Sequence, residues 1–212
     1  RMVLPVFPGS STQNVGVQQM LDFIVDFFPS PLEARTRPAK KGDVDIDVAP
    51  DPSANFSAIC FKVMVDPYVG KLSFLRVNSG TLTTDNNIYN VNKGEDERIS
   101  SFKFMTGKEG KDVKEIAVGD ILALPKLQSV QVGDTLGMKG STVKYPPIEF
   151  PKPVYSVAIT AKSRADEDKL GNAINKTLEE DPSLSFEKNP ETNDSVLSGM
   201  GDMHIDIVLA KM

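Results

Sequence analysis

The only histidine in the 212-residue chain, His204, lies between two carboxylates, Asp202 and Asp206. An imidazole beside a carboxylate can transfer protons or bind a metal ion. A metal site needs further ligands, and the chain's other residues near His204 offer only carboxylates. A hydrolytic triad needs an activated nucleophile, and no GxSxG motif occurs in the sequence. We therefore predict no catalytic residue and no metal site, and expect His204 to make packing or partner contacts.

The single cysteine and two glycine–lysine stretches could also do chemistry. Cys60 lies in the apolar run AICFKVMV, where a small buried side chain is more common than a nucleophile. GKLS at residues 70–73 and GKEGKD at 107–112 do not fit the phosphate-binding motif GxxxxGK[ST]. We predict that neither stretch binds a nucleotide and that both are solvated loops.

Short basic and aromatic stretches could in principle contact RNA. Three cations near one predicted helix are interleaved with acidic residues, which favours a solvated, salt-bridged face; they are Lys162, Arg164 and Lys169. Phe102 and Phe104 alternate around Lys103, as inward-facing core residues of a strand do. The net charge is −5, and no dense basic stripe typical of a nucleic-acid-binding protein is present.

The elements that would position these residues begin with residues 1–34. MVLPVFPG at 2–9 predicts a buried strand, and GVQQMLDFIVDFFPSPL at 16–32 predicts an amphipathic helix that Pro29 and Pro31 end. One strand and one helix cannot bury their own apolar faces, so this pair is expected to belong to a larger α/β domain. Residues 35–52 are rich in proline and predict a linker or an extended excursion.

Residues 53–145 predict an antiparallel β domain. Short apolar segments alternate with turn signals, as in a closed barrel or a sandwich; the segments are 56–65, 71–77, 87–92, 98–105, 120–127 and 134–138. Val118-Gly119-Asp120 and Val132-Gly133-Asp134 each precede a strand and predict tight turns.

Residues 146–212 predict a mixed α and β domain that follows the proline-rich hinge YPPIEFPKP. The pattern is strand 154–160, helix 163–181, two short strands, and a helix opening at GDMHIDIVLAKM. This β-α-β-β-α order is that of a ferredoxin-like unit without its last strand. Each helix has apolar residues at helical spacing; they are Leu170, Ala173, Ile174, Thr177 and Leu178, and Ile205, Val208, Leu209 and Met212.

Composition excludes several classes of protein. Apolar residues make up 40% and charged residues 25% of the chain, as in an ordinary globular protein. No apolar run reaches the roughly 20 residues of a membrane span, and the first residues lack a signal-peptide pattern. With one cysteine and no internal disulfide, a cytoplasmic location is expected.

Several motifs, in order along nearly the whole chain, resemble translation elongation factor G. PVFPGSS and GVQQMLDFIVDFFPSPL resemble the end of its GTPase domain, and FKVMVDPYVGKLSFLRVNSGTL resembles the signature of its second domain. IEFPKPVYSVAI, ADEDKLGNAI, EEDPS and SGMGDMHIDI resemble its third domain. The resemblance implies the last strand and helix of an α/β GTPase domain, a translation-factor β-barrel and an incomplete ferredoxin-like domain.

The resemblance also implies function. The parent protein would be a ribosome-dependent GTPase that uses GTP and Mg²⁺, whereas this part alone would hold no cofactor and hydrolyse nothing. Ser10 and Ser11 match the serine–alanine pair that approaches the guanine. Gly199, Gly201 and His204 match a strand-to-helix turn at a domain interface that relays nucleotide state. The implied partners are the small ribosomal subunit and the GTPase and tip domains of the same protein, with no membrane.

Departures from the family pattern leave two alternatives. GMGDMH replaces GMGELH, and LPKL replaces a valine-glycine-leucine stretch, which favours a paralogue that acts in ribosome recycling or ribosomal protection. A different class, a hydrolase that uses His204 with Asp202 or Asp206, would lose its activity in a His204→Ala variant.

Overall fold

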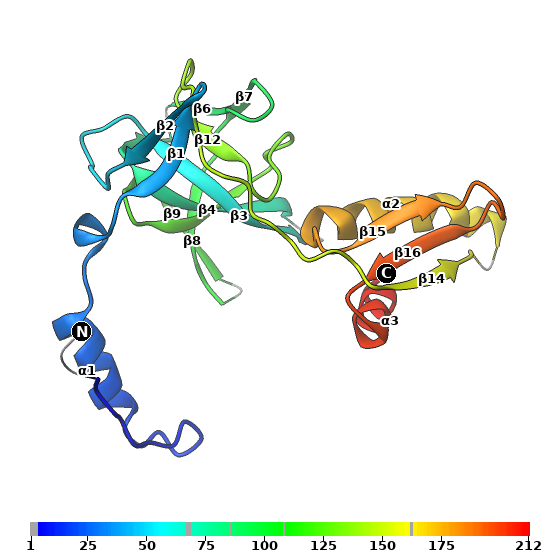
Figure 1. Ribbon diagram of the computed structural model, residues 1–212, viewed down its shortest axis with the longest axis horizontal. Coiled ribbons are helices and arrows are strands. Elements are labelled where there is room, and N and C mark those ends of the chain that lie inside the picture. The colour runs from blue at the N-terminus through cyan, green and yellow to red at the C-terminus, as the bar shows by residue number, and fades with distance from the viewer. Residues whose placement is uncertain (1–3, 67–68, 85, 108, 162) are drawn as a thin grey trace.

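A computed structural model describes residues 4–66, 69–84, 86–107, 109–161 and 163–212. Within them the protein is mostly β, with three α-helices and one short 3-10 helix. Figure 1 shows three parts along the chain: an N-terminal helix, a β-rich part, and a C-terminal unit with two helices against a small sheet. None of the described helices is long and apolar enough to span a bilayer.

The N-terminal part contains helix α1 (Val17–Phe27) but no strand in its described residues. Residues 4–9 have no regular structure, and only an isolated bridge joins Ser10 to Val15. The predicted strand at 2–9 is therefore wrong for residues 4–9, because no neighbouring strand is present to pair with them. Helix α1 has no buried residue and stands apart from the rest (Figure 1), as expected for an element whose apolar face has no partner here.

The predicted linker at 35–52 is instead largely a β-hairpin. Strands β1 (Arg37–Lys41) and β2 (Val44–Val48) pair across a turn in which Gly42 has φ +62°, and β13 (Val143–Lys144) pairs with the outer side of β1. The alternating apolar residues of β2 were the signal of a strand, and the prolines obscured it. A 3-10 helix, η1 (Pro31–Glu33), connects this hairpin to α1.

The β-rich part is built on an antiparallel sheet of eight strands in the order β7-β6-β12-β3-β4-β11-β8-β9, with β5 and β10 paired beside it. The long central pair is β3 (Ser57–Asp66) and β4 (Gly70–Ser79). The other strands are β5 (Thr81–Thr83), β6 (Asn87–Asn90), β7 (Glu95–Arg98), β8 (Phe102–Thr106), β9 (Glu109–Val113), β10 (Glu115–Ala117), β11 (Ile121–Pro125) and β12 (Thr135–Gly137).

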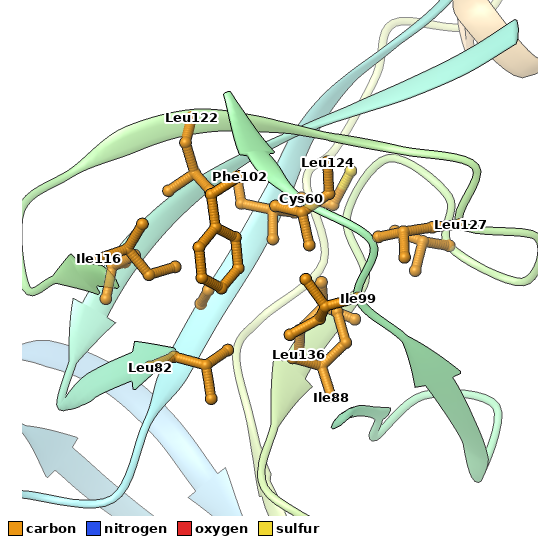
Figure 2. Close-up of a cluster of buried hydrophobic side chains, with 14 of the residues drawn as sticks. Cys60, Leu82, Ile88, Ile99, Phe102, Ile116, Leu122, Leu124, Leu127 and Leu136 are labelled. Carbon is orange, nitrogen blue, oxygen red and sulfur yellow. The ribbon is translucent and has the colours of Figure 1, made fainter. Parts of the chain in front are cut away.

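One apolar cluster fills the interior of this part. Figure 2 shows Phe102, Ile116 and Leu82 pointing into the same interior, and all three are almost fully buried. Phe102 is thus a core residue, as predicted, and Phe104 packs partly buried against the cluster. Cys60 is fully buried here, and burial raises the pKa of its thiol to about 12, which keeps it protonated.

The turn predictions at Gly119 and Gly133 are confirmed, since both residues have positive φ, near +94° and +93°. In each turn the aspartate accepts the N–H of the residue three positions earlier; the acceptors are Asp120 and Asp134. Three predictions are wrong. GKLS at 70–73 is the start of strand β4, with Leu72 and Ser73 buried, and is not a solvated loop. Most of GKEGKD forms strand β9, paired with β8, and the predicted segment 98–105 is interrupted between β7 and β8.

The C-terminal unit has the predicted order of elements: β14 (Tyr155–Ile159), α2 (Arg164–Glu180), β15 (Ser185–Lys188), β16 (Ser195–Gly199) and α3 (Asp202–Lys211). The antiparallel strand order is β14-β16-β15, and Leu178 of α2 and Ile205 of α3 share one apolar cluster with Leu197 of β16. In α3 only Ile205 and Val208 are buried. The prediction that Leu209 and Met212 belong to the inner face is wrong, because both are more than a third exposed.

Candidate interdomain site around the end of helix α2

The last turn of α2 places successive carboxylates where the C-terminal unit meets the eight-stranded sheet. The Oε2 atom of Glu179 lies 3.0 Å from Nζ of Lys71 on β4. The next residue, Glu180, accepts a hydrogen bond from the backbone N–H of Val65 on β3. One helix end therefore holds the β3–β4 pair at two neighbouring points.

Asp181, the C-cap residue of α2, makes a third contact, with α3. Its Oδ2 atom lies 2.9 Å from Nε2 of His204, and the backbone N–H of Met200 donates to Nδ1 of His204 over 3.1 Å. Because Nδ1 is an acceptor, the proton of the neutral ring resides on Nε2, which donates to Asp181. His204 thus joins the start of α3 to the end of α2.

Hydrogen bonding keeps the Asp181 carboxylate ionised. Burial raises the pKa of this carboxyl, but hydrogen bonds from Ser183 and His204 outweigh burial, so the pKa lies below its ordinary value of 3.8. The Ser183 hydroxyl and N–H donate to Oδ1 over 2.6 and 2.9 Å, while His204 occupies Oδ2. Both carboxylate oxygens are therefore engaged, and at neutral pH the group is an anion held in one orientation.

We name Glu179, Glu180 and Asp181 the acidic triplet, because consecutive residues bind β4, β3 and α3. Acidic side chains at a helix C-terminus face the negative end of the helix dipole, which costs about 0.3–1 kcal/mol each. The last turn of α2 has no basic residue to offset that cost. Lys71, the backbone N–H of Val65 and His204, all outside the helix, offset this unfavourable interaction with the dipole. Acidic residues are placed against the helix dipole in this way mainly where the helix end makes a functional contact.

The two glycines before α3 differ in their surroundings. A Cβ atom on Gly199 would lie 2.9 Å from Ile205 Cδ1, 3.0 Å from His204 Nδ1 and 3.1 Å from Leu184 Cδ2. A Cβ on Gly201 would meet no atom within 4 Å, and the φ of 174° at this residue is ordinary extended backbone. A side chain at 199 would therefore require the side chains of His204, Ile205 or Leu184 to move, whereas one at 201 would displace nothing.

This geometry does not fit a hydrolase. The carboxylate on His204 is Asp181, whereas Asp202 accepts a hydrogen bond from the N–H of Met203 over 2.7 Å. A triad needs the serine hydroxyl on the imidazole, but the Ser183 hydroxyl donates to Asp181, and both ring nitrogens of His204 are already used. Among the described residues, no group of three histidine, cysteine or acidic side chains is placed to hold a metal ion.

The structure does not bring the remaining predicted site residues to this place. Ser10 and Ser11 lie in a turn before α1, and α1 stands apart from the C-terminal unit that contains α3 (Figure 1). Ser10 and Val15 exchange backbone hydrogen bonds of 2.9 and 3.0 Å there. Their role at a nucleotide stays a prediction. Lys162 and the side chain of Arg164 lie outside the described residues, and Lys169 is exposed on α2.

Comparison with known proteins gives the class of protein to which this site belongs. Residues 55–139 match the model for elongation factor G domain 2, and residues 150–212 match the model for elongation factor G domain III. The crystal structure of ttk003000868 from Thermus thermophilus is similar, with a TM-score of 0.76 and 30% sequence identity. That similarity covers 93% of this chain and 27% of the Thermus chain.

The two matches, in order along the chain, define the class of protein as a translation elongation factor. The chain belongs to the elongation factor G family. The two matched ranges lie on either side of the exposed segment that follows Tyr145, and the acidic triplet is a contact between the two matched domains. The predicted domain limits at 34, 52 and 145 stay predictions.

Proposed function

We propose that this chain is the central part of a ribosome-dependent GTPase of the elongation factor G type. In this proposal the eight-stranded sheet, with β5 and β10, is a translation-factor β-barrel. Its single interior cluster supports that assignment. The C-terminal unit is a ferredoxin-like domain without its fourth strand, which its strand order and its two helices in one apolar cluster support.

The proposed division of roles follows the family. The barrel contacts the small ribosomal subunit in the cytoplasm, and the C-terminal unit relays the nucleotide state toward domains that act on the ribosome. GTP and Mg²⁺ bind in a GTPase domain beyond the residues of this chain, and Ser10 and Ser11 approach the guanine from its border. Residues in the barrel and the C-terminal unit then transmit motion and take no part in hydrolysis.

The acidic triplet is the single observation that carries the relay. A displacement of the β3–β4 pair acts on Glu179 and Glu180, and the adjacent Asp181 passes it to α3 through His204. The ion pair between Glu179 and Lys71 stabilises the contact by at most about 1 kcal/mol, because the Glu179 side chain is 42% exposed. Such a weak link can open and close during a working cycle without unfolding either domain.

The test uses the full-length product of the gene, assayed for ribosome-stimulated GTP hydrolysis and for translocation of tRNA and mRNA. We expect the Lys71→Met and His204→Ala variants to hydrolyse GTP at a rate close to that of the unchanged protein but to translocate several-fold more slowly. Lys41→Met, which removes one exposed charge from β1, is the matched control and should change neither rate. Absence of ribosome-stimulated hydrolysis in the unchanged protein would refute the proposed function.

Assays of ribosomal subunit splitting and of antibiotic release, run on the same full-length protein, separate the alternatives. A protein that hydrolyses GTP on the ribosome but splits ribosomal subunits instead of moving tRNA acts in recycling. One that releases a bound antibiotic acts in ribosomal protection. Equal translocation by the Lys71→Met variant and the unchanged protein would leave the GTPase assignment intact and remove the relay.

A further inference from the structure

An arginine-lined cavity of about 300 Å³ lies between the segment that follows α1 and strand β4, away from the acidic triplet. Arg35 lines it from the segment that leads into β1, Arg37 from the first position of β1, and Arg76 from β4. None of its lining residues is acidic. Three positive side chains around one small space are unusual in a chain whose net charge is −5.

The three arginines are available to a ligand. Among the described residues, Arg35, Arg37 and Arg76 take part in none of the ion pairs found, which all involve lysines or His204. Asp47 adjoins Val48 but does not line the cavity, and three other acidic residues beside the lining segments are held elsewhere. Each accepts a backbone N–H no more than three residues away in the chain; these residues are Glu33, Asp51 and Asp120.

The walls of the cavity are built by close packing. Pro31 of η1 lies over Gly119, where an added Cβ would be only 2.3 Å from the proline Cβ. Asn78 lines the inner wall, is buried, and has an Oδ1 atom without a hydrogen-bond donor. The buried Asn78 therefore shapes the inner wall, and the arginines alone are left to contact an anion.

We propose that this cavity binds a small anion that contains a pyrophosphate group. Guanidinium groups bind phosphate oxygens through pairs of parallel hydrogen bonds, and two linked phosphates use three such groups better than one phosphate does. A volume of about 300 Å³ accommodates a diphosphate with a small attached group and excludes a nucleic-acid duplex. The proposal is independent of the proposed function, because it concerns neither the ribosome nor GTP hydrolysis.

The test is calorimetric titration of the 212-residue chain with inorganic pyrophosphate, without Mg²⁺, at low and at physiological salt. We expect saturable binding of one equivalent that weakens as salt increases, since the interaction is between charges. The Arg76→Met variant should bind at least about tenfold more weakly, the loss expected for one charge-assisted hydrogen-bonded contact. Arg76→Lys, which keeps the charge and loses the paired donors, should fall between the two. Lys41→Met is the control and should bind normally.

A second titration, with a nucleoside diphosphate, identifies the source of the pyrophosphate group. Equal affinities indicate free pyrophosphate, and tighter binding of the nucleotide indicates that the attached group is also recognised. The proposal is overturned if pyrophosphate does not bind saturably, if Arg76→Met and Lys41→Met weaken binding equally, or if only an RNA oligonucleotide binds. Melting curves of the variants verify that each is folded.

Discussion

At the scale of single residues, His204 connects two helices because both of its ring nitrogens are used. Nδ1 accepts the N–H of Met200 at the turn into α3, and Nε2 donates to Asp181 at the end of α2. A doubly protonated ring has no acceptor, so protonation would break the first of these bonds while strengthening the second. The neutral ring is therefore the form that fits the observed geometry.

The first prediction concerns the loss of this connection. In His204→Ala, the N–H of Met200 and one oxygen of Asp181 lose their partners, so we expect the free energy of unfolding to fall by about 1–3 kcal/mol. Urea denaturation measures the change. Asp206→Asn, on the exposed side of the same helix, should stay within about 0.5 kcal/mol of the unchanged protein. Equal losses in the two variants would contradict the connecting role.

The second prediction separates the two glycines. Gly199→Ala places a methyl group against His204, Ile205 and Leu184 at 2.9–3.1 Å, so we expect a loss of about 1–3 kcal/mol in stability. Gly201→Ala meets nothing within 4 Å and should be neutral, or more stable by about 0.4–1 kcal/mol through a less flexible unfolded chain. Thermal and urea unfolding of the two variants give the comparison. A greater loss of stability in Gly201→Ala than in Gly199→Ala would show that Gly199 does not pack closely on its neighbours.

The third prediction concerns acid. Because the pKa of Asp181 in the folded protein is lowered, its ionised carboxylate stabilises the fold fully above the ordinary value of 3.8. That stabilisation is lost as pH falls below 3.8 through the folded pKa. We expect Asp181→Asn to be less stable than the unchanged protein near neutral pH, and the difference to shrink on acidification below about pH 4. Unfolding measured across this range provides the test, and a difference independent of pH would exclude an ionised Asp181 as its source.

At the scale of elements, the tight turn before β11 also serves as a docking position. Gly119 has φ +94° and lies under Pro31, so the chain can pass from α1 to β1 in contact with the sheet. Asp120 fixes the turn by accepting the N–H of Ala117 over 2.8 Å. The same glycine therefore satisfies a backbone requirement and a packing requirement.

The fourth prediction measures the packing requirement alone. Gly119→Ala should cost the strain of a left-handed alanine, roughly 1–2 kcal/mol, and should also displace η1 from the sheet. Gly42→Ala is the matched control, because Gly42 has φ +62° but no atom within 4 Å of an added Cβ. We expect faster hydrogen exchange at residues 30–38 in Gly119→Ala and not in Gly42→Ala. Similar exchange in both variants would show that Pro31 is not held there.

Sequence patterns predicted the elements whose partners are local. Helix α2 has the expected inner face, with Ile174 buried and Leu170, Ala173, Thr177 and Leu178 partly buried, because helical spacing reports a single stripe facing one sheet. The hairpin β1–β2 is a local pairing that the sequence analysis missed, because the prolines around it obscured the alternation of β2. Only the added pairing of β1 with β13, about 100 residues later, leaves no local pattern. The strand at 2–9 was predicted from an apolar run alone. Residues 4–9 form no strand because no neighbouring strand is present to pair with them.

The candidate site was predictable only in part. His204 and Gly199 were singled out from motifs, but Asp181 lies 23 residues from His204, and sequence proximity favoured Asp202 and Asp206 instead. The missed signal was the run of acidic residues at the end of a predicted helix, where the dipole disfavours them. Such a run indicates partners elsewhere in the fold. The arginine-lined cavity had no signal at all, because its members come from segments about 40 residues apart.

At the scale of the whole molecule, the exposed apolar surface is concentrated on the N-terminal part. Helix α1 buries no residue, and Val25, Phe27 and Phe28 are at least 60% exposed. Phe23 stacks on Phe27 and meets the ring of Phe7 at a tilt, which gives the segment some structure of its own. These contacts are few compared with those in the two matched domains.

The fifth prediction follows from this arrangement. A helix of 11 residues without tertiary packing is marginal in water, so amide protons of α1 should exchange with solvent almost as fast as in an unfolded peptide. Amides of β3 and β4 should exchange much more slowly. Hydrogen exchange followed by mass spectrometry measures both in one sample, and repeating it at lower protein concentration controls for self-association through Phe27 and Phe28. Slow exchange in α1 at all concentrations would show that it is packed.

The acidic triplet also constrains how the chain can change. Successive helical residues point about 100° apart, so Glu179 and Glu180 reach β4 and β3, and the C-cap residue Asp181 that follows them reaches α3. Deleting a single residue upstream in α2 would turn all three carboxylates by about 100° and exchange their partners. The exposed positions of α2, such as Asn172 and Asn175, should therefore tolerate new side chains, whereas an insertion or deletion in the helix should not be tolerated. The number of residues in this helix is itself under structural constraint.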